Sequence, residues 1–271
     1  MIKTIPVINN KGGVGKTTTT VNLAAGLGQT GRKVLVVDLD SQGSASFALG
    51  IERDQLKPST AAVLFGEHPP SEVLRPTSTQ NVDVLTGSLR LADADTKLSA
   101  QKGREKRLAR ALSEVADDYD TILIDCAPST SLLTINALVA ADAFIIPVNP
   151  SYLSLEGVVS LGEVVKNVRM SLGEAAPVLG VLLTMIQRMD EETRAMMNEV
   201  RNHYGGKVFD TIIRHDSALE EAPNRGQSIF DYAPTSQGAK EYRSLVEEVV
   251  DRLDRYGSVY GTVHEKQSSR A

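Results

Sequence analysis

The chain has 271 residues, is 41% hydrophobic, and carries 29 Lys and Arg residues against 34 Asp and Glu residues, for a net charge of -5. This length and apolar content predict one large α/β domain with a full core, and the composition indicates a soluble enzyme or switch and not a fibre or a membrane protein. The acidic balance excludes a general attraction to nucleic acid, so DNA contact would need a local basic patch. The single cysteine, Cys126, excludes an internal disulfide framework and predicts a reducing compartment.

Targeting signals are not evident in the sequence. The N-terminus passes directly into a strand pattern, without the basic region and apolar core of a secretory signal. No apolar run approaches the ~18 residues that a membrane-spanning helix needs. We therefore expect a cytoplasmic protein with no membrane partner.

The first predicted strand, Lys3–Asn9, is followed by a glycine-rich loop, NKGGVGKTT, at residues 10–18. A standard phosphate-binding loop reads G-x-x-x-x-G-K-[ST], and Asn10 stands where its first glycine would be. The loop is thus a variant, and it carries a second lysine, Lys11, five positions before Lys16. A helix is predicted over Thr17–Gly28 from its apolar positions, so strand, loop and helix occur in the required order.

The chemistry of this loop follows from its residue types. Glycines can adopt backbone conformations closed to other residues, which lets successive N–H groups turn toward a phosphate. Lys16 would supply a positive charge to the β- and γ-phosphates, and the Thr17 hydroxyl would bind Mg²⁺. The N-terminal end of the following helix adds its positive dipole. The predicted nucleotide-binding residues of the loop are Lys11, Gly12, Gly13, Val14, Gly15, Lys16, Thr17 and Thr18.

Apolar strand patterns and helical patterns then alternate along the chain, which is typical of crossover units in a mostly parallel sheet. Further strands are predicted at Lys33–Asp38, Asn81–Leu85, Thr121–Asp125, Ala143–Val148, Val178–Ile186 and Val208–Ile213. Further helices are predicted at Arg104–Ala116, Leu132–Ala140, Leu155–Ser171, Glu191–His203 and Ser236–Arg255. The runs are continuously apolar, as strands covered on both faces require. The predicted fold is α/β, a single doubly wound, mostly parallel sheet with helices on both faces, of the P-loop NTPase type.

Domain limits are read from composition. The segment Leu56–Lys97 contains four prolines and is predicted to form short helices and loops, not a linker between domains. One domain is expected over residues 1–256. Residues 257–271 are polar and are expected to form a frayed tail.

Three carboxylates follow apolar strands, where a parallel sheet presents groups to its ligand crevice. Asp125 has the position of a Walker B carboxylate, which holds Mg²⁺; its alternative is a strand-end cap. Asp40 is predicted to orient or deprotonate the water that attacks the γ-phosphate. Asp38 would support the metal shell or fix the loop, and either Asp38 or Asp40 could instead cap a helix that begins in the SQGSAS segment. Cys126 is expected to be a small buried residue beside the site.

Four blocks in this sequence resemble the ParA/Soj partition ATPases and occur in the order of that family. The resemblance covers the chain from the first strand to about Leu253, and the first three blocks are shared with the wider superfamily of MinD and the nitrogenase iron protein. The blocks are KGGVGKTT at Lys11–Thr18, VVDLDSQGSAS at Val36–Ser46, YDTILIDCAPSTSLLTINAL at Tyr119–Leu138, and EEAPNRGQSIFDYAPTSQGAKEY at Glu220–Tyr242.

The resemblance implies a nucleotide-driven dimer switch with ATP and Mg²⁺ as cofactors. Lys11, Lys16 and Asp40 would be the catalytic residues, with Thr17, Asp38 and Asp125 at the metal. In this family the early lysine reaches the phosphates of the partner subunit, so a homodimer holds two ATP molecules. The ATP form binds DNA without sequence preference on the nucleoid, and a ParB-type adaptor stimulates hydrolysis. No arginine finger is evident, so turnover without the partner is expected to be weak.

The sequence differs from the family in the segment before the fourth block, which bears on DNA binding. Relatives of the Soj type commonly read Ile-Pro-Arg-Asn before the fourth block, whereas this chain has Ile213-Arg214-His215-Asp216. Asp216 and Pro223 occupy positions where the family holds adenine. The candidate DNA contacts are Arg188, Arg194, Arg214 and Arg225, with Arg201 as a further arginine of the same kind. Solvent-exposed helix faces and loops carry arginines routinely, so each of these arginines could instead be an ordinary surface residue. The basic run Lys102–Arg110 is likewise interpreted as the exposed face of a helix.

Four other functions were weighed against partition. A MinD-like membrane-associated ATPase would need a basic amphipathic C-terminal helix, and Leu245–Leu253 is acidic on its polar side. A nitrogenase-type reductase needs paired cysteines, which one cysteine excludes. A ligase or synthetase with the same loop would be active as a monomer. A ParA-like positioner of a non-DNA cargo would keep all of these residues.

Overall fold

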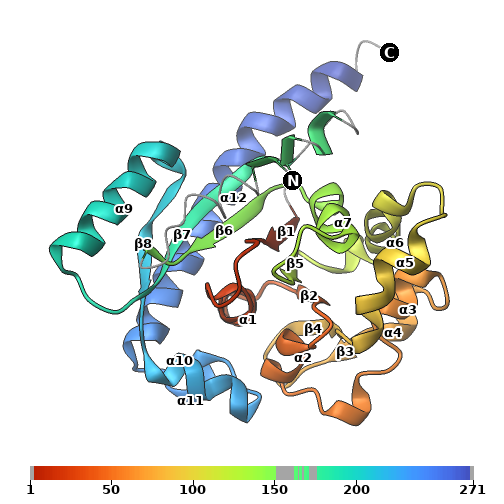
Figure 1. The fold of residues 1–271 in the computed structure, drawn as a ribbon, viewed down its shortest axis with the longest axis horizontal. Coiled ribbons are helices and arrows are strands. Elements are labelled where there is room, and N and C mark those ends of the chain that lie inside the picture. Colours follow the sequence, from red (N-terminus) through yellow and green to blue (C-terminus); the bar gives the residue numbers. More distant parts are fainter. Residues whose placement is uncertain (1–2, 151–161, 164, 167, 171–175, 269–271) are drawn as a thin grey trace.

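The computed structural model describes residues 3–150, 162–163, 165–166, 168–170 and 176–268 (Figure 1). The helix predicted at Leu155–Ser171 falls largely outside the described residues, although 162–163, 165–166 and 168–170 are helical. The other predicted strands and helices are present, with boundaries that shift by a few residues.

The described residues contain an eight-stranded sheet in the order β3-β4-β2-β5-β1-β6-β7-β8. Neighbouring strands are parallel except for the β3–β4 pair, which confirms the predicted fold class. The two-residue edge strand β3 was not predicted, because it is too short to carry a pattern. The strands are β1 Thr4–Val7, β2 Val34–Leu39, β3 Arg75–Pro76, β4 Val82–Leu85, β5 Thr121–Cys126, β6 Phe144–Val148, β7 Val178–Ile186 and β8 Val208–Arg214.

Helices cover both faces of the sheet (Figure 1). One apolar core is closed by α1 Lys16–Gln29, α2 Ser44–Ala48, α10 Ser217–Glu221, η7 Ala222–Arg225, α11 Ile229–Tyr232 and α12 Gln237–Ser268. The other is closed by α3 Thr60–Phe65, α4 Pro70–Val73, η2 Leu89–Asp93, α5 Ala94–Leu98, α6 Arg107–Ser113, α7 Leu132–Ala140 and α9 Glu191–Tyr204. The remaining short helical turns are η1 Arg53–Gln55, η3 Arg104–Lys106, η4 Ala116–Asp118 and η6 Gly205–Lys207.

Strand β2 shows why its sequence is continuously apolar. Leu35, Val37 and Leu39 belong to one core, and Val34 and Val36 belong to the other. Successive side chains of a strand point to opposite faces, so a strand with helices on both sides needs an apolar residue at every position. The charged residue Asp38 interrupts this pattern and is nevertheless fully buried.

The C-terminal helix α12 packs its first half on the sheet and continues past residue 256 (Figure 1). The domain boundary placed at 256 stays a prediction. The proline-containing segment Leu56–Lys97 holds short helices and the strands β3 and β4 of the same sheet, so it belongs to the same body as the rest.

Candidate functional site

The glycine-rich loop joins the carboxyl end of β1 to the first residue of α1, Lys16. Gly13 has φ 69° and Gly15 has φ 79°, which lie in the left-handed region that favours glycine. Gly12 does not have a positive φ, and a Cβ on it would meet no atom within 4 Å. Two of the three loop glycines therefore have a conformational reason to be glycine.

Two polar residues outside the motif hold the loop in place. The buried Asn9 donates from Nδ2 to the Pro147 carbonyl at 2.7 Å, and its Oδ1 accepts from the Lys11 N–H at 3.0 Å. Thr184 of β7 donates its hydroxyl to the Val14 carbonyl at 2.9 Å. The sequence analysis did not predict a role for either residue. The only signal that the sequence offers is a polar residue within or at the end of an apolar run.

The Lys16 ammonium lies inside the loop and not in solvent. Its Nζ donates to the Lys11 carbonyl at 2.6 Å, and the residue is 7% exposed. Burial lowers the pKa of Lys16, and the charges of Asp125 and Asp40 oppose that shift. Lys11 itself is half-buried at the start of the loop, and its backbone carbonyl accepts the Lys16 hydrogen bond.

Asp125 is the penultimate residue of β5 and contacts the first turns of α1. Its Oδ2 accepts from the Thr17 hydroxyl at 2.8 Å, and its Oδ1 accepts from the Thr20 hydroxyl at 3.4 Å. Burial, with the nearby charge of Asp38, raises the pKa of Asp125 to about 8. The sequence predicted Thr17 and Asp125 as metal residues, and the fold brings them into direct contact.

Asp38 lies opposite Asp125 in the register of β2 and β5 and is fully buried. Its Oδ2 accepts from the Ser46 N–H at 2.9 Å and the Ser46 hydroxyl at 2.7 Å, and its Oδ1 accepts from the Asp40 N–H at 3.0 Å. A Cβ on Gly87 would lie 2.7 Å from the Asp38 carboxyl. Burial raises the pKa of Asp38 to about 6. These contacts are those of a residue that fixes the loop after β2.

Asp40 follows β2 and is only half-buried. Its Oδ1 accepts from the Gln42 N–H at 2.9 Å, so the carboxylate is held by one turn contact and is otherwise available at the edge of the site. Its charge acts on the pKa values of Lys16 and Asp125. Asp40 is therefore the most accessible of the three predicted carboxylates.

The donor set fits Mg²⁺. The Thr17 hydroxyl and the Asp125 carboxylate are hard oxygen donors, and Mg²⁺ in nucleotide sites takes one or two protein oxygens, with phosphates and water completing the octahedron. No group of three or more His, Cys, Asp and Glu side chains suited to a metal occurs among the described residues.

Of the predicted adenine residues, Asp216 caps the N-terminus of α10 and Pro223 lies in the following turn η7. Asp216 accepts from the Ala218 N–H at 3.0 Å and from the Gly238 N–H at 2.8 Å, so it ties α10 to the start of α12. Pro223 is half-buried in η7. Cys126 is buried, and burial raises the pKa of its thiol, which leaves it uncharged beside the site.

The candidate DNA-contacting arginines are divided between two places. Arg188 and Arg194 are exposed around the β7–α9 connection, and Arg214 ends β8 in register with Ile186 of β7. Arg225 lies apart from them on η7. The Arg214 guanidinium pairs with Glu241 at 2.9 Å, and that glutamate side chain is only 8% exposed. The Arg214 side chain therefore takes part in an ion pair within the fold.

Comparisons with known proteins agree with this geometry. A family model described as an AAA domain matches residues 2–176. The sporulation initiation inhibitor protein Soj of Bacillus subtilis (strain 168) is 41% identical over 92% of this chain and 98% of its own length. The chromosome partitioning protein ParA of Myxococcus xanthus (strain DK1622) is 38% identical over 92% of this chain and 88% of its own.

A solved structure gives a similar match. The crystal structure of cobyrinic acid a,c-diamide synthase from Mycobacterium smegmatis, with bound ADP and magnesium, is 32% identical with a TM-score of 0.82 and covers 94% of this chain and 96% of that chain. Within the described part of this chain, no helix is long and apolar enough to cross a membrane.

Proposed function

The chain belongs to the ParA/Soj-type partition ATPases, and from that premise we propose that it is an ATP-dependent homodimer switch that binds nonspecific DNA and drives plasmid or chromosome partition. The observation that carries the proposal is the loop with two lysines, Lys11 and Lys16, directly above the Thr17–Asp125 contact. The loop can hold phosphates, and Thr17 and Asp125 can hold a metal. Lys11 is a further cation, which a site formed by one subunit alone would not need.

The cofactors are ATP and Mg²⁺, and the loop residues 11–18 hold the phosphates. Thr17 and Asp125 are the residues that hold the metal, which when bound offsets phosphate charge. Lys16 lies within the loop, where a desolvated ammonium interacts strongly with phosphate oxygens. Asp38 organises the turn that presents Asp40. Asp40 orients the attacking water or accepts its proton, which its half-buried position permits.

Lys11 supplies the coupling between nucleotide and assembly. Its ammonium reaches the phosphates held by a second copy of the chain, so each subunit completes the other's site. The Lys11 ammonium would contact the γ-phosphate of ATP only in the dimer. ATP would therefore bind the dimer more tightly than the monomer and shift the equilibrium toward the dimer. Hydrolysis removes that phosphate charge and weakens the pair.

DNA binding is assigned to Arg188 and Arg194 around the β7–α9 connection, to Arg214 at the end of β8, and to Arg225 on η7. The net charge of -5 requires such a local patch. A ParB-type adaptor stimulates hydrolysis, which is weak without it, and releases the protein from DNA. The protein is then cytoplasmic and associated with the nucleoid.

Three alternatives keep the same phosphate site. A positioner of a non-DNA cargo would differ only in its adaptor, and a MinD-like ATPase would bind liposomes in the presence of ATP. The similarity to a protein named as a cobyrinic acid a,c-diamide synthase favours, as a second candidate, a ligase active as a monomer. For the ligase, the ATPase rate per molecule would be independent of protein concentration; for the dimer switch, it would rise with concentration.

The decisive experiment is an electrophoretic shift on random-sequence DNA with ATP, with ADP and without nucleotide. We expect binding with ATP alone, little dependence on sequence, and a steep loss of affinity with salt, because phosphate contacts release counterions. Binding that is equal in all three nucleotide states, or absent in all of them, would reject the partition proposal.

A further inference from the structure

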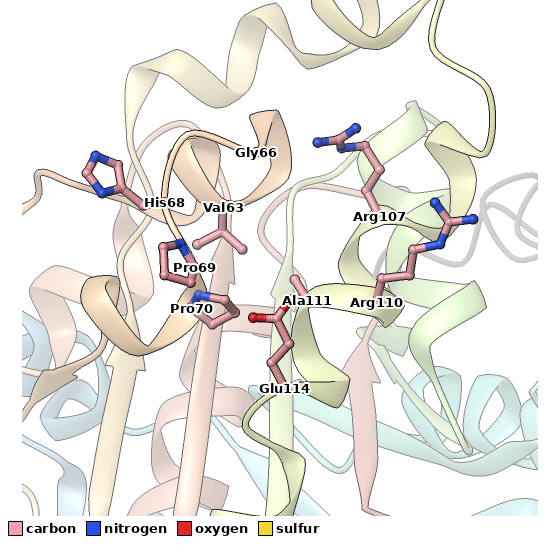
Figure 2. A pocket seen from close by; sticks show the side chains of 9 residues that line it. All are labelled: Val63, Gly66, His68, Pro69, Pro70, Arg107, Arg110, Ala111 and Glu114. Atoms are coloured by element: carbon pink, nitrogen blue, oxygen red, sulfur yellow. The ribbon is translucent and has the colours of Figure 1, made fainter.

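A pocket lies between helices α3, α4 and α6, and none of its lining residues belongs to the phosphate loop (Figure 2). It has a volume of about 330 Å³, and the nine residues that line it are all in or between these helices. Figure 2 shows two arginine side chains, Arg107 and Arg110, extending from α6 on one side of it, with Glu114 on the side that faces Pro70.

The floor of this pocket is apolar and stiff. Val63, Ala111 and Pro70 are buried, and Pro69 precedes Pro70 at the N-terminus of α4. Prolines have a fixed φ and no backbone N–H, so this wall offers an apolar surface that changes little when a ligand binds. Such a surface suits an apolar side chain better than a bare anion.

One side of the pocket is held in place by Arg107. Its Nε donates to the Leu64 carbonyl at the end of α3, and its Nη1 donates to Gln101 Oε1 at 2.5 Å. Gly66, with φ 76°, caps α3, and a Cβ there would lie 2.8 Å from Arg107 Nη2. Arg107 is therefore a structural cation, fixed in position by contacts on both sides.

Arg110 differs from Arg107 in its contacts. Its guanidinium lies against Gly103, within 3.1 to 3.6 Å of where a Cβ would be, and the residue is exposed. Among the hydrogen bonds and ion pairs of residues 3–150, none is donated by the Arg110 guanidinium, and none joins it to Glu114 one turn away. Its five N–H donors are available to a ligand.

The segment that ends at Arg110 is basic in a chain that is acidic as a whole, and the acids Glu114, Asp117 and Asp118 follow it. The segment from residue 102 to residue 110 contains five Lys and Arg residues, Lys102, Arg104, Lys106, Arg107 and Arg110, against the single acid Glu105. Glu105 is paired with Arg104 at 3.1 Å. The charge that remains favours a negatively charged group beside Arg110.

We propose that this pocket binds an acidic peptide segment of a partner protein. The peptide carboxylate accepts two parallel hydrogen bonds from the Arg110 guanidinium, and a neighbouring apolar side chain packs on Val63, Pro70 and Ala111. Glu114 stands at the same opening and repels a polyanion, so the site favours a peptide with one carboxylate over nucleic acid. None of the lining residues belongs to the phosphate loop, so peptide binding here can be tested separately from nucleotide binding.

The test uses the full chain and two fluorescein-labelled peptide pools in an anisotropy titration. One pool is randomised around a central Leu-Glu-Leu, and the matched pool carries Leu-Gln-Leu. Each is titrated with the wild type, Arg110→Ala and the control Lys106→Ala, which removes a nearby cation that does not line the pocket. ATPase activity of each variant, measured in parallel, verifies that the fold and the phosphate site remain intact.

We expect the glutamate pool to bind wild type and Lys106→Ala alike, and to lose about tenfold or more in affinity with Arg110→Ala, the size expected for a charge-assisted bidentate contact. The glutamine pool should bind at least about tenfold more weakly than the glutamate pool. Equal binding of both pools, no binding of either, or an Arg110→Ala effect confined to random-sequence DNA would overturn the proposal. Each peptide titration is run both with and without ATP. A failure of peptide binding would therefore not count against the partition function, which is tested by ATP-dependent binding to DNA.

Discussion

Asp38 of β2 and Asp125 of β5 are directly paired residues on adjacent parallel strands, and both are completely buried. They have different partners: Asp38 is surrounded by Ser46, Gly87 and the Asp40 backbone, and Asp125 accepts from hydroxyls of α1. Burial raises the pKa of both carboxyls, and the charge of Asp38 raises that of Asp125 further, so the pair is costly to ionise in the absence of a cation. A metal or an ammonium at this edge would relieve that cost.

The first prediction concerns the two lysines of the loop. Lys16→Ala should abolish nucleotide binding, because it removes the charge that contacts the subunit's own phosphates. Lys11→Ala should retain some binding and lose ATP-dependent dimers, because only the contact to the partner subunit is removed. Size-exclusion chromatography with light scattering, run with ATP, with ADP and without nucleotide, measures this. A Lys11→Ala protein that still dimerises with ATP contradicts the role given to Lys11.

The second prediction concerns hydrolysis. Asp40→Ala should slow ATP turnover and accumulate the ATP-bound dimer, because Asp40 is the accessible carboxylate at the site and its side chain makes one turn contact, with the Gln42 N–H. Phosphate release and dimer lifetime are measured on the same sample. Asp54→Ala, in η1 and outside the site, serves as the control. Wild-type turnover in Asp40→Ala would assign the water-activating role elsewhere.

The third prediction follows from the raised pKa of Asp125, about 8. Mg²⁺ must displace a proton from this carboxyl, so affinity for Mg²⁺-ADP should rise with pH up to about 8 and level off above it. Calorimetry at pH 7 in two buffers of different ionisation enthalpy should show proton release, and Asp125→Asn should remove it. An identical binding enthalpy in both buffers would argue against a protonated Asp125.

The same pKa shift sets the pH dependence of stability without ligand. The folded state binds the proton more tightly than the unfolded state, so the free energy of unfolding should decrease as pH rises from about 4 toward 8. Urea titrations across this window give the slope, and Mg²⁺-ADP should flatten it. The opposite slope would show that the buried carboxyl remains ionised.

The fourth prediction tests the enclosure of Asp38. Gly87→Ala would place a Cβ 2.5 Å from the Asp40 carbonyl and 2.7 Å from the Asp38 carboxyl, and such overpacking typically costs about 1–3 kcal/mol. Gly206→Ala is the matched control, since a Cβ there meets nothing within 4 Å. Chemical denaturation compares the two variants, and equal stability would mean that the turn can move away from Asp38 without cost.

The fifth prediction separates DNA contact from fold stability among the arginines. Arg214→Ala should lower the free energy of unfolding by about 1–2 kcal/mol, because it leaves the nearly buried Glu241 without its ion-pair partner. Arg188→Ala should leave stability unchanged and weaken binding to random-sequence DNA. Denaturation and electrophoretic shifts are run on both variants. A stability loss in Arg188→Ala, or unchanged DNA binding, would remove it from the proposed contact surface.

The amino-acid sequence by itself determined the variant phosphate loop, the strand–loop–helix order and the α/β class, because short-range spacing and local hydrophobic pattern encode these features. The sequence also singled out Thr17 and Asp125, each from its position after a loop or a strand. What it could not supply was the strand order, in which β5 lies between β2 and β1 and brings Asp38 opposite Asp125.

Only the tertiary structure decided what those residues contact. Asn9 anchors the start of the loop to the Pro147 carbonyl of β6, and Thr184 of β7 holds Val14. Gly87 encloses Asp38, and Glu241 pairs with Arg214. The pocket beside Arg110 likewise needs α3, α4 and α6 together. Each depends on packing between distant segments, and a local pattern carries no information on which segments will meet, because long-range contacts are selected by the burial of the whole core.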